Sequence, residues 1–100
     1  MAPKELRRHP RRPIQELVPI TWEEPNSGQR GARVRCTDIS ESGMRVEVER
    51  PLPLRTMVKV DARKLGLIGM ASVRYCRQGK NFKYIVGLEF TGGMVWRPTD

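Results

Sequence analysis

The sequence has few of the residues that bind metals or perform nucleophilic chemistry. It contains one histidine, His9, and two cysteines, Cys36 and Cys76, with no CxxC pair. One histidine and two scattered thiols give no credible metal site, and two cysteines do not make a disulfide framework. No nucleophile–base pair stands out either. We therefore expect a protein that is not an enzyme and that carries no metal or other cofactor.

Long apolar runs are also missing. No apolar segment is long enough to cross a bilayer, and no apolar stretch follows the basic N-terminus as it would in a secretory signal. The chain has 100 residues, of which 38% are hydrophobic. That length and composition predict one small domain with one core. We expect a soluble, cytoplasmic protein.

Acidic residues are outnumbered by basic ones, which gives a net charge of +8. This excess favours an anionic partner: nucleic acid, an acidic membrane surface or a phosphorylated small molecule. A basic surface that only keeps the protein soluble is the alternative. Residues 1–13, with three prolines and few apolar side chains, predict a flexible arm. Five of the nineteen basic residues lie in this arm: Lys4, Arg7, Arg8, Arg11 and Arg12.

The rest of the chain alternates with a period of two, which indicates β-strands. About six short strands separated by turn residues predict an all-β fold, and a chain this short favours a closed antiparallel barrel over a sandwich. We place the barrel at residues 14–91 and a C-terminal tail at 92–100. Residues 66–77 predict one bent strand. Cys36 is expected to face the core and Cys76 is not. The residues expected to face inward are Val18, Ile20, Trp22, Ala32, Val34, Cys36, Met44, Val46, Val48, Val58, Val60, Tyr84, Val86, Leu88 and Phe90.

Two polar stretches stand out, the arm "RRHPRRP" and the connection "DISESG" at residues 38–43. Arginine binds phosphate or the O6/N7 edge of guanine bidentately, and its guanidinium plane can stack on a purine. Asp38 can accept hydrogen bonds from the N1–H and N2–H₂ groups of guanine, and Ser40 can bind a phosphate or a base amine. Gly43 is expected to adopt a positive φ and to let a ligand approach the backbone.

Each stretch also has a simpler explanation. Basic arms are often solvated tails, and Asp-x-Ser connections often cap their own backbone as Asx or ST turns. Their occurrence together in one short β-rich chain is more informative than either alone.

Together these residues resemble the PilZ domain, a family that binds the bacterial second messenger cyclic di-GMP. The family pattern is RxxxR in an N-terminal arm followed by (D/N)xSxxG at the end of a strand. The resemblance extends from about Leu6 to Phe90 and includes the closing strand "YIVGLEF". Two departures are the basic Arg12 at a position that is usually apolar, and the lack of an evident C-terminal helix. The residues that fill the two motifs are Arg7 and Arg11 in the first and Asp38, Ser40 and Gly43 in the second.

The resemblance implies a six-stranded barrel and a cyclic di-GMP site. Arg7 and Arg11 would contact guanine and phosphate, Asp38 and Ser40 would contact a guanine edge, and Arg8 would add a further contact. The arm would become ordered on the ligand, and the signal would pass to a protein partner whose identity the sequence does not give.

Two alternatives remain open. One is a small basic β-barrel that binds single-stranded nucleic acid, which is disfavoured because the aromatic residues mostly fall on positions expected to face inward. The other is a degenerate PilZ domain that serves only as a protein-interaction adaptor.

Overall fold

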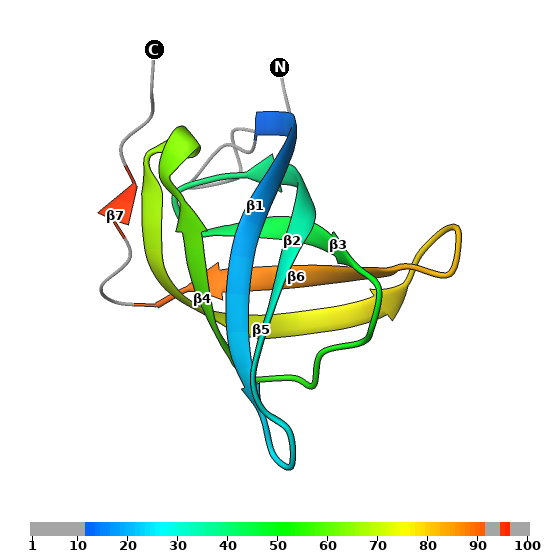
Figure 1. The fold of residues 1–100 in the computed structure, drawn as a ribbon. Helices are drawn as coiled ribbons and strands as arrows, with labels where there is room; N and C mark the ends of the chain where they lie inside the picture. The colour runs from blue at the N-terminus through cyan, green and yellow to red at the C-terminus, as the bar shows by residue number, and fades with distance from the viewer. Residues whose placement is uncertain (1–11, 92–94, 97–100) are drawn as a thin grey trace.

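The described part of the chain, residues 12–91 and 95–96 of a computed structural model, is built from β-strands (Figure 1). A single turn of 3-10 helix, η2 (Arg63–Leu65), joins the fourth and fifth strands, and no α-helix occurs among the described residues. The strands are β1 (Arg12–Glu24), β2 (Gly28–Ile39), β3 (Gly43–Val48), β4 (Met57–Ala62), β5 (Leu67–Gln78), β6 (Tyr84–Phe90) and the two-residue β7 (Val95–Trp96).

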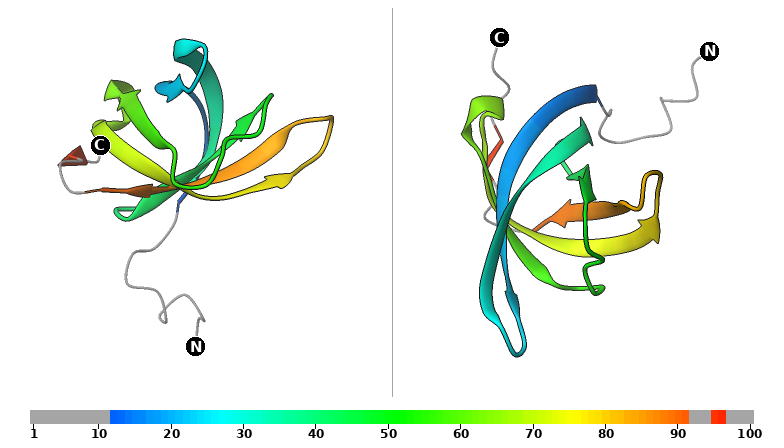
Figure 2. Two further views of the ribbon diagram at one scale, coloured as in Figure 1. Left: turned by 90° about the horizontal axis from the view of Figure 1, so that it is seen from below. Right: turned by 45° about the vertical axis from the view of Figure 1, so that its right-hand side comes forward.

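Six of these strands close into an antiparallel barrel. The order is β4-β1-β2-β3-β6-β5, and the pairing of β4 with β5 completes the circle. β7 adds to β5 at Leu67 and Ile68. The β1–β2 and β5–β6 hairpins extend from the barrel in different directions (Figures 1 and 2). The prediction of an all-β, six-stranded antiparallel barrel is confirmed.

Alternation along the strands produces the core as expected. Most of the residues predicted to face inward are buried, and Trp22, Tyr84 and Phe90 are partly buried against the same cluster. The prediction for Ala32 is wrong, because this residue is exposed. The reason is that β2 pairs with β3 only from Arg35 onward, so the earlier part of β2 has β1 as its one strand neighbour.

Two irregularities in strand pairing decide which side chains leave the core. The register of β2 with β3 shifts between Cys36 and Asp38, and the register of β5 with β6 shifts between Val73 and Tyr75. Each shift is a β-bulge, which places one extra residue in a strand and inverts the alternation that follows. Thus Ile39 is buried after Cys36, three residues on instead of two.

The bulge in β5 also corrects the expectation for Cys76. Strict alternation from the buried Val73 would turn Cys76 outward, but Cys76 is partly buried and packs against the core. Cys36 is fully buried as expected, and both thiols are free. Burial raises the pKa of the Cys36 thiol to about 12, and the nearby Asp38 charge adds to the shift.

Among the described residues, no helix combines the length and the hydropathy needed to cross a membrane.

Candidate functional site

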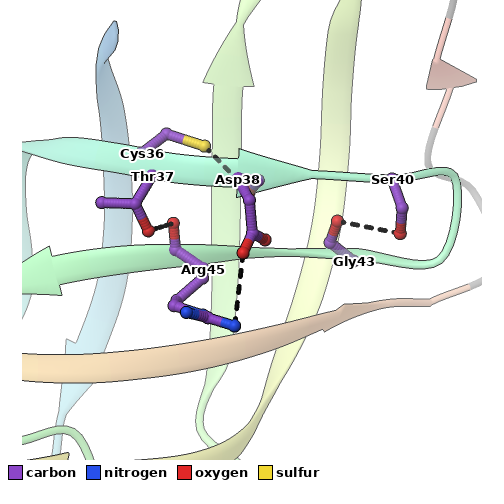
Figure 3. Close-up of polar contacts among 6 residues, drawn as sticks. All are labelled: Cys36, Thr37, Asp38, Ser40, Gly43 and Arg45. Carbon is purple, nitrogen blue, oxygen red and sulfur yellow. Dashed lines mark hydrogen bonds and ion pairs between the residues drawn. The ribbon is translucent and has the colours of Figure 1, made fainter. Parts of the chain in front are cut away.

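The connection between β2 and β3 is held by the side chain of Ser40, which is fully buried. The Ser40 N–H donates to the Gly43 carbonyl oxygen at 2.9 Å, and the Ser42 N–H donates to Ser40 Oγ at 3.2 Å. Ser40 Oγ also donates to the Gly43 carbonyl oxygen at 3.5 Å (Figure 3). These bonds satisfy a hydroxyl that lies inside the barrel. They are the local turn-capping contacts that the sequence offered as the simpler explanation, and a ligand contact by Ser40 stays a prediction.

Gly43 is required by close packing and not by a left-handed backbone. The glycines with positive φ in the described residues are Gly28, Gly66 and Gly69, so the expectation of a positive φ at Gly43 is wrong. A Cβ on Gly43 would instead collide with the carbonyl oxygen of Leu88 in β6. The absence of a side chain therefore lets the start of β3 lie directly against β6.

Asp38 projects from the outer surface of the barrel because the bulge in β2 has turned it away from the core. Its Oδ2 atom lies 3.3 Å from Arg45 Nη2, and the Thr37 hydroxyl donates to the Arg45 carbonyl oxygen at 3.3 Å (Figure 3). The Asp38 side chain is 14% exposed and that of Arg45 is 38% exposed. Arg45 Nε is buried and has no hydrogen-bond partner among the described residues. A carboxylate and a guanidinium with an unused donor are thus fixed side by side.

Strand pairing places further residues beside Asp38 and Arg45 on the outer surface of β6 and β5. Arg45 is the register partner of both Asp38 and Gly87, and Gly87 is the partner of Tyr75. The Tyr75 ring occupies the space above Gly87, where a Cβ would collide with it. The Arg77 guanidinium lies 5.6 Å from the centroid of this ring, within cation–π range. We call Asp38, Arg45, Gly87 and Tyr75 the outer row.

The outer row offers three kinds of contact in one line. The Asp38 carboxylate can accept hydrogen bonds from N–H groups of a base. The Arg45 guanidinium can donate to phosphate or to the acceptor edge of guanine. The Tyr75 ring, 37% exposed, can stack on a base face. This combination suits a purine nucleotide better than a simple polyanion, which would not need the carboxylate.

The start of β1 lies beside the outer row. In the pairing of β1 with β2, Arg12 is the partner of Ile39 and Pro13 is the partner of Asp38. Neighbouring strands lie about 4.8 Å apart. The segment that leads out of the predicted arm therefore passes next to Asp38, although 25 positions separate Pro13 from Asp38 in the sequence. The predicted site residues Arg7, Arg8 and Arg11 themselves lie outside the described residues.

Sequence reasoning missed two members of the outer row, Arg45 and Tyr75. An outward arginine on an alternating strand indicates only an exposed cross-strand pair, such as the one between Arg35 Nε and Glu47 Oε1 at 3.8 Å. Arg45 and Tyr75 become neighbours of Asp38 only through the register of four strands and two bulges. No local pattern in the sequence marks either feature.

The described residues contain no group of three or more histidine, cysteine, aspartate or glutamate side chains that could hold a metal ion. The outer row itself supplies one carboxylate, which would be a poor metal site beside a guanidinium.

Comparison with known proteins gives a family and a fold neighbour. The family model for the PilZ domain matches residues 5–94. The comparison with curated proteins finds no match. Among solved structures, the Bacillus subtilis inhibitor of motility, MotI/DgrA, is similar with a TM-score of 0.57 at 17% sequence identity. The match covers 85% of this chain but 42% of that one, so the chain spans less than half of its neighbour's length. At this identity, the likeness shows the barrel fold.

Proposed function

Because the chain belongs to the PilZ domain family, we propose that it is a receptor for cyclic di-GMP that binds the nucleotide between the arm and the outer row. The family is one of cyclic di-GMP-related receptors and effectors, which are generally not enzymes. Binding by this particular chain is the proposal. The observation that carries it is the pairing of Arg12 and Pro13 with Ile39 and Asp38, which joins the two motif-bearing stretches at one place.

In the proposed complex, each group has a distinct partner on the ligand. Asp38 accepts from the N1–H and N2–H₂ groups of one guanine, and Tyr75 stacks on a base. Arg45, whose side chain is 38% exposed, donates from its guanidinium to a phosphate or to the acceptor edge of guanine. Arg7 and Arg11 wrap the ligand from the arm, and Arg8 adds a contact.

Ser40 and Gly43 contribute mainly by shaping the connection that supports Asp38. The Ser40 hydroxyl bonds within its own turn, and Gly43 brings β3 against β6. A direct bond from Ser40 to the ligand, which the family motif implies, would require its hydroxyl to leave these partners.

Ligand binding is proposed to order the arm against the barrel. Fixing each arm residue costs conformational entropy, about 1–2 kcal/mol per residue. Charge-assisted arginine–phosphate bonds are strong enough to offset that cost. The position of the arm then reports whether the ligand is bound, and a protein partner of unknown identity would read it. Action in the cytoplasm stays a prediction.

Isothermal titration calorimetry with cyclic di-GMP tests the proposal. Arg11→Ala and Asp38→Asn should each weaken binding by about 10- to 100-fold, the usual effect of losing a hydrogen bond to a charged group. Arg33→Ala is the matched control, because Arg33 is an exposed arginine of β2 outside the outer row. Its affinity should equal that of the wild type.

Circular dichroism should show unchanged strand content in all three variants. Unchanged affinity in both Arg11→Ala and Asp38→Asn would contradict the proposed site. The nucleic-acid alternative predicts a different result, in which single-stranded DNA binds and its affinity falls steeply with salt.

A further inference from the structure

The turn that joins β5 to β6 has an unusual residue at its centre. The Lys83 N–H donates to the Lys80 carbonyl oxygen at 3.0 Å, and the Gly79 N–H donates to the Lys83 carbonyl oxygen at 2.8 Å. Both central residues have positive φ, 57° at Asn81 and 62° at Phe82. Hairpin turns with positive φ at both central positions favour Asn-Gly, because glycine alone adopts this conformation without strain. Phenylalanine in the glycine position strains the backbone.

Folding gains little from this phenylalanine in return. The Phe82 side chain is 89% exposed, more than any other large apolar side chain among the described residues. It therefore adds almost no buried area to the core. A bulky residue held in a strained conformation without a packing gain points to a role outside the fold.

The surroundings of Phe82 are basic. Residues 77–83 carry Arg77, Lys80 and Lys83 and no aspartate or glutamate. The hairpin extends away from the barrel body, so its tip is convex and accessible (Figure 1). The whole chain carries a net charge of +8.

We propose that the β5–β6 tip docks the protein on an anionic membrane surface, with the Phe82 ring inserted at the interface and Lys80 and Lys83 bound to lipid phosphates. This role goes beyond cyclic di-GMP binding and does not depend on it. An anionic bilayer fits the tip better than a protein pocket does. A specific protein interface buries about 800 Å² on each partner, far more than one side chain on a convex turn can supply. A bilayer needs only an apolar wedge and nearby cations, whose contributions add.

Flotation with vesicles measures the proposed docking. The full chain should bind vesicles of phosphatidylcholine mixed with phosphatidylglycerol and should bind vesicles of phosphatidylcholine alone much less. Phe82→Gly should lower the partition coefficient on the mixed vesicles about tenfold, because it removes the inserted ring. Lys80→Gln together with Lys83→Gln should lower it by a similar factor or more.

Phe82→Gly should also raise the melting temperature by a few degrees, because glycine relieves the strain in the turn. A variant that melts at a higher temperature but binds vesicles more weakly has lost docking and not folding. Met57→Ala is the matched control: Met57 is an exposed apolar residue of β4, 45% accessible, and its removal should leave vesicle binding unchanged.

Insertion is read directly with Phe82→Trp. Its emission, after subtraction of the wild-type signal from Trp22 and Trp96, should be quenched by brominated lipid in the mixed vesicles. The arginine-rich arm could hold the protein on these vesicles without the tip. In that case Phe82→Gly would bind as the wild type does and the new tryptophan would not be quenched, which would overturn the proposal. Failure of the full chain to bind either kind of vesicle would also overturn it and would favour a protein pocket for Phe82.

Discussion

The β2–β3 connection and the β5–β6 turn each join two neighbouring antiparallel strands, but Ser40 in the first is buried and Phe82 in the second is exposed. At the first, the Ser40 side chain is fully buried and Gly43 lies against the backbone of β6. At the second, Phe82 stands 89% exposed on a strained backbone. The residues of the first connection are explained by the folded structure itself. The central residue of the second is not, so its explanation must be sought in a partner. Mutations should therefore lower stability at the first connection and raise it at the second.

Gly43→Ala should have the largest effect and would sharpen the contrast. The added methyl group meets the carbonyl oxygen of Leu88, and a backbone atom cannot move aside as a side chain can. We expect a loss of about 3 kcal/mol in the free energy of unfolding, at the upper end of the range for overpacking. Urea denaturation measures this change.

Two other glycines provide graded controls for that variant. A Cβ on Gly87 would meet the ring of Tyr75, which can rotate away, so Gly87→Ala should cost less than Gly43→Ala. A Cβ on Gly31 would meet the Thr21 methyl group at 3.4 Å, an ordinary contact, so Gly31→Ala should cost little. Equal losses of unfolding free energy in all three variants would contradict the close-packing explanation of Gly43, because the contacts of the added Cβ differ at the three positions.

Tyr75 tests whether the outer row belongs to the binding site or only covers Gly87. Tyr75→Ala should weaken cyclic di-GMP binding by about 10- to 100-fold, the usual effect of losing a base-stacking ring. Tyr75→Phe keeps the ring and should bind nearly as the wild type does. Calorimetry gives both affinities. If Tyr75→Ala binds like the wild type while losing stability, the ring is a structural cover and the ligand lies elsewhere.

The buried thiol of Cys36 in β2 predicts a smaller, pH-dependent effect. Because the pKa of Cys36 is raised from 9.0 to about 12, the folded state holds the thiol proton more tightly than the unfolded state does. The resulting stability is fully present below pH 9 and is lost as the pH rises toward 12. At one pH unit above 9.0, linkage gives a loss of about 1.4 kcal/mol.

This loss is measured as the difference in pH dependence between the wild type and Cys36→Ala, which cancels the titration of tyrosine and lysine. The variant should be less stable at neutral pH but should lack this part of the alkaline decline. Parallel curves for the two proteins would show that the Cys36 thiol does not titrate as its burial predicts.

Much of the fold followed from simple alternation in the sequence. The six-stranded barrel and nearly all inward residues were predicted, because the period-two pattern is a local property of each strand. The first part of β2 was mispredicted at Ala32, where the β1–β2 hairpin extends past β3 and alternation no longer reports burial. The two motif-bearing stretches were found for a similar reason, since each is contiguous.

The site could be predicted only in part, because the positions of Arg45 and Tyr75 relative to Asp38 depend on strand register. Arg45 and Tyr75 join Asp38 through pairings between β2, β3, β6 and β5. The bulges that turn Asp38 and Tyr75 outward occur at Thr37 and Arg74, which are ordinary strand residues with no turn signal. A pattern read one strand at a time therefore places both side chains on the wrong face.

The alternation on either side of these two bulges makes the number of residues in each strand as restrictive as their identity. Replacing Thr37 leaves the count of residues between Cys36 and Ile39 intact, so inner and outer faces are preserved. Removing a residue from the regular part of the strand, such as Arg35, would instead exchange those faces for the remainder of β2, sending a carboxylate into the core and an isoleucine into water. Within these strands the protein can thus vary its chemistry far more freely than its spacing, and an insertion or deletion of one residue that no bulge accommodates acts there as a reversal of inside and outside.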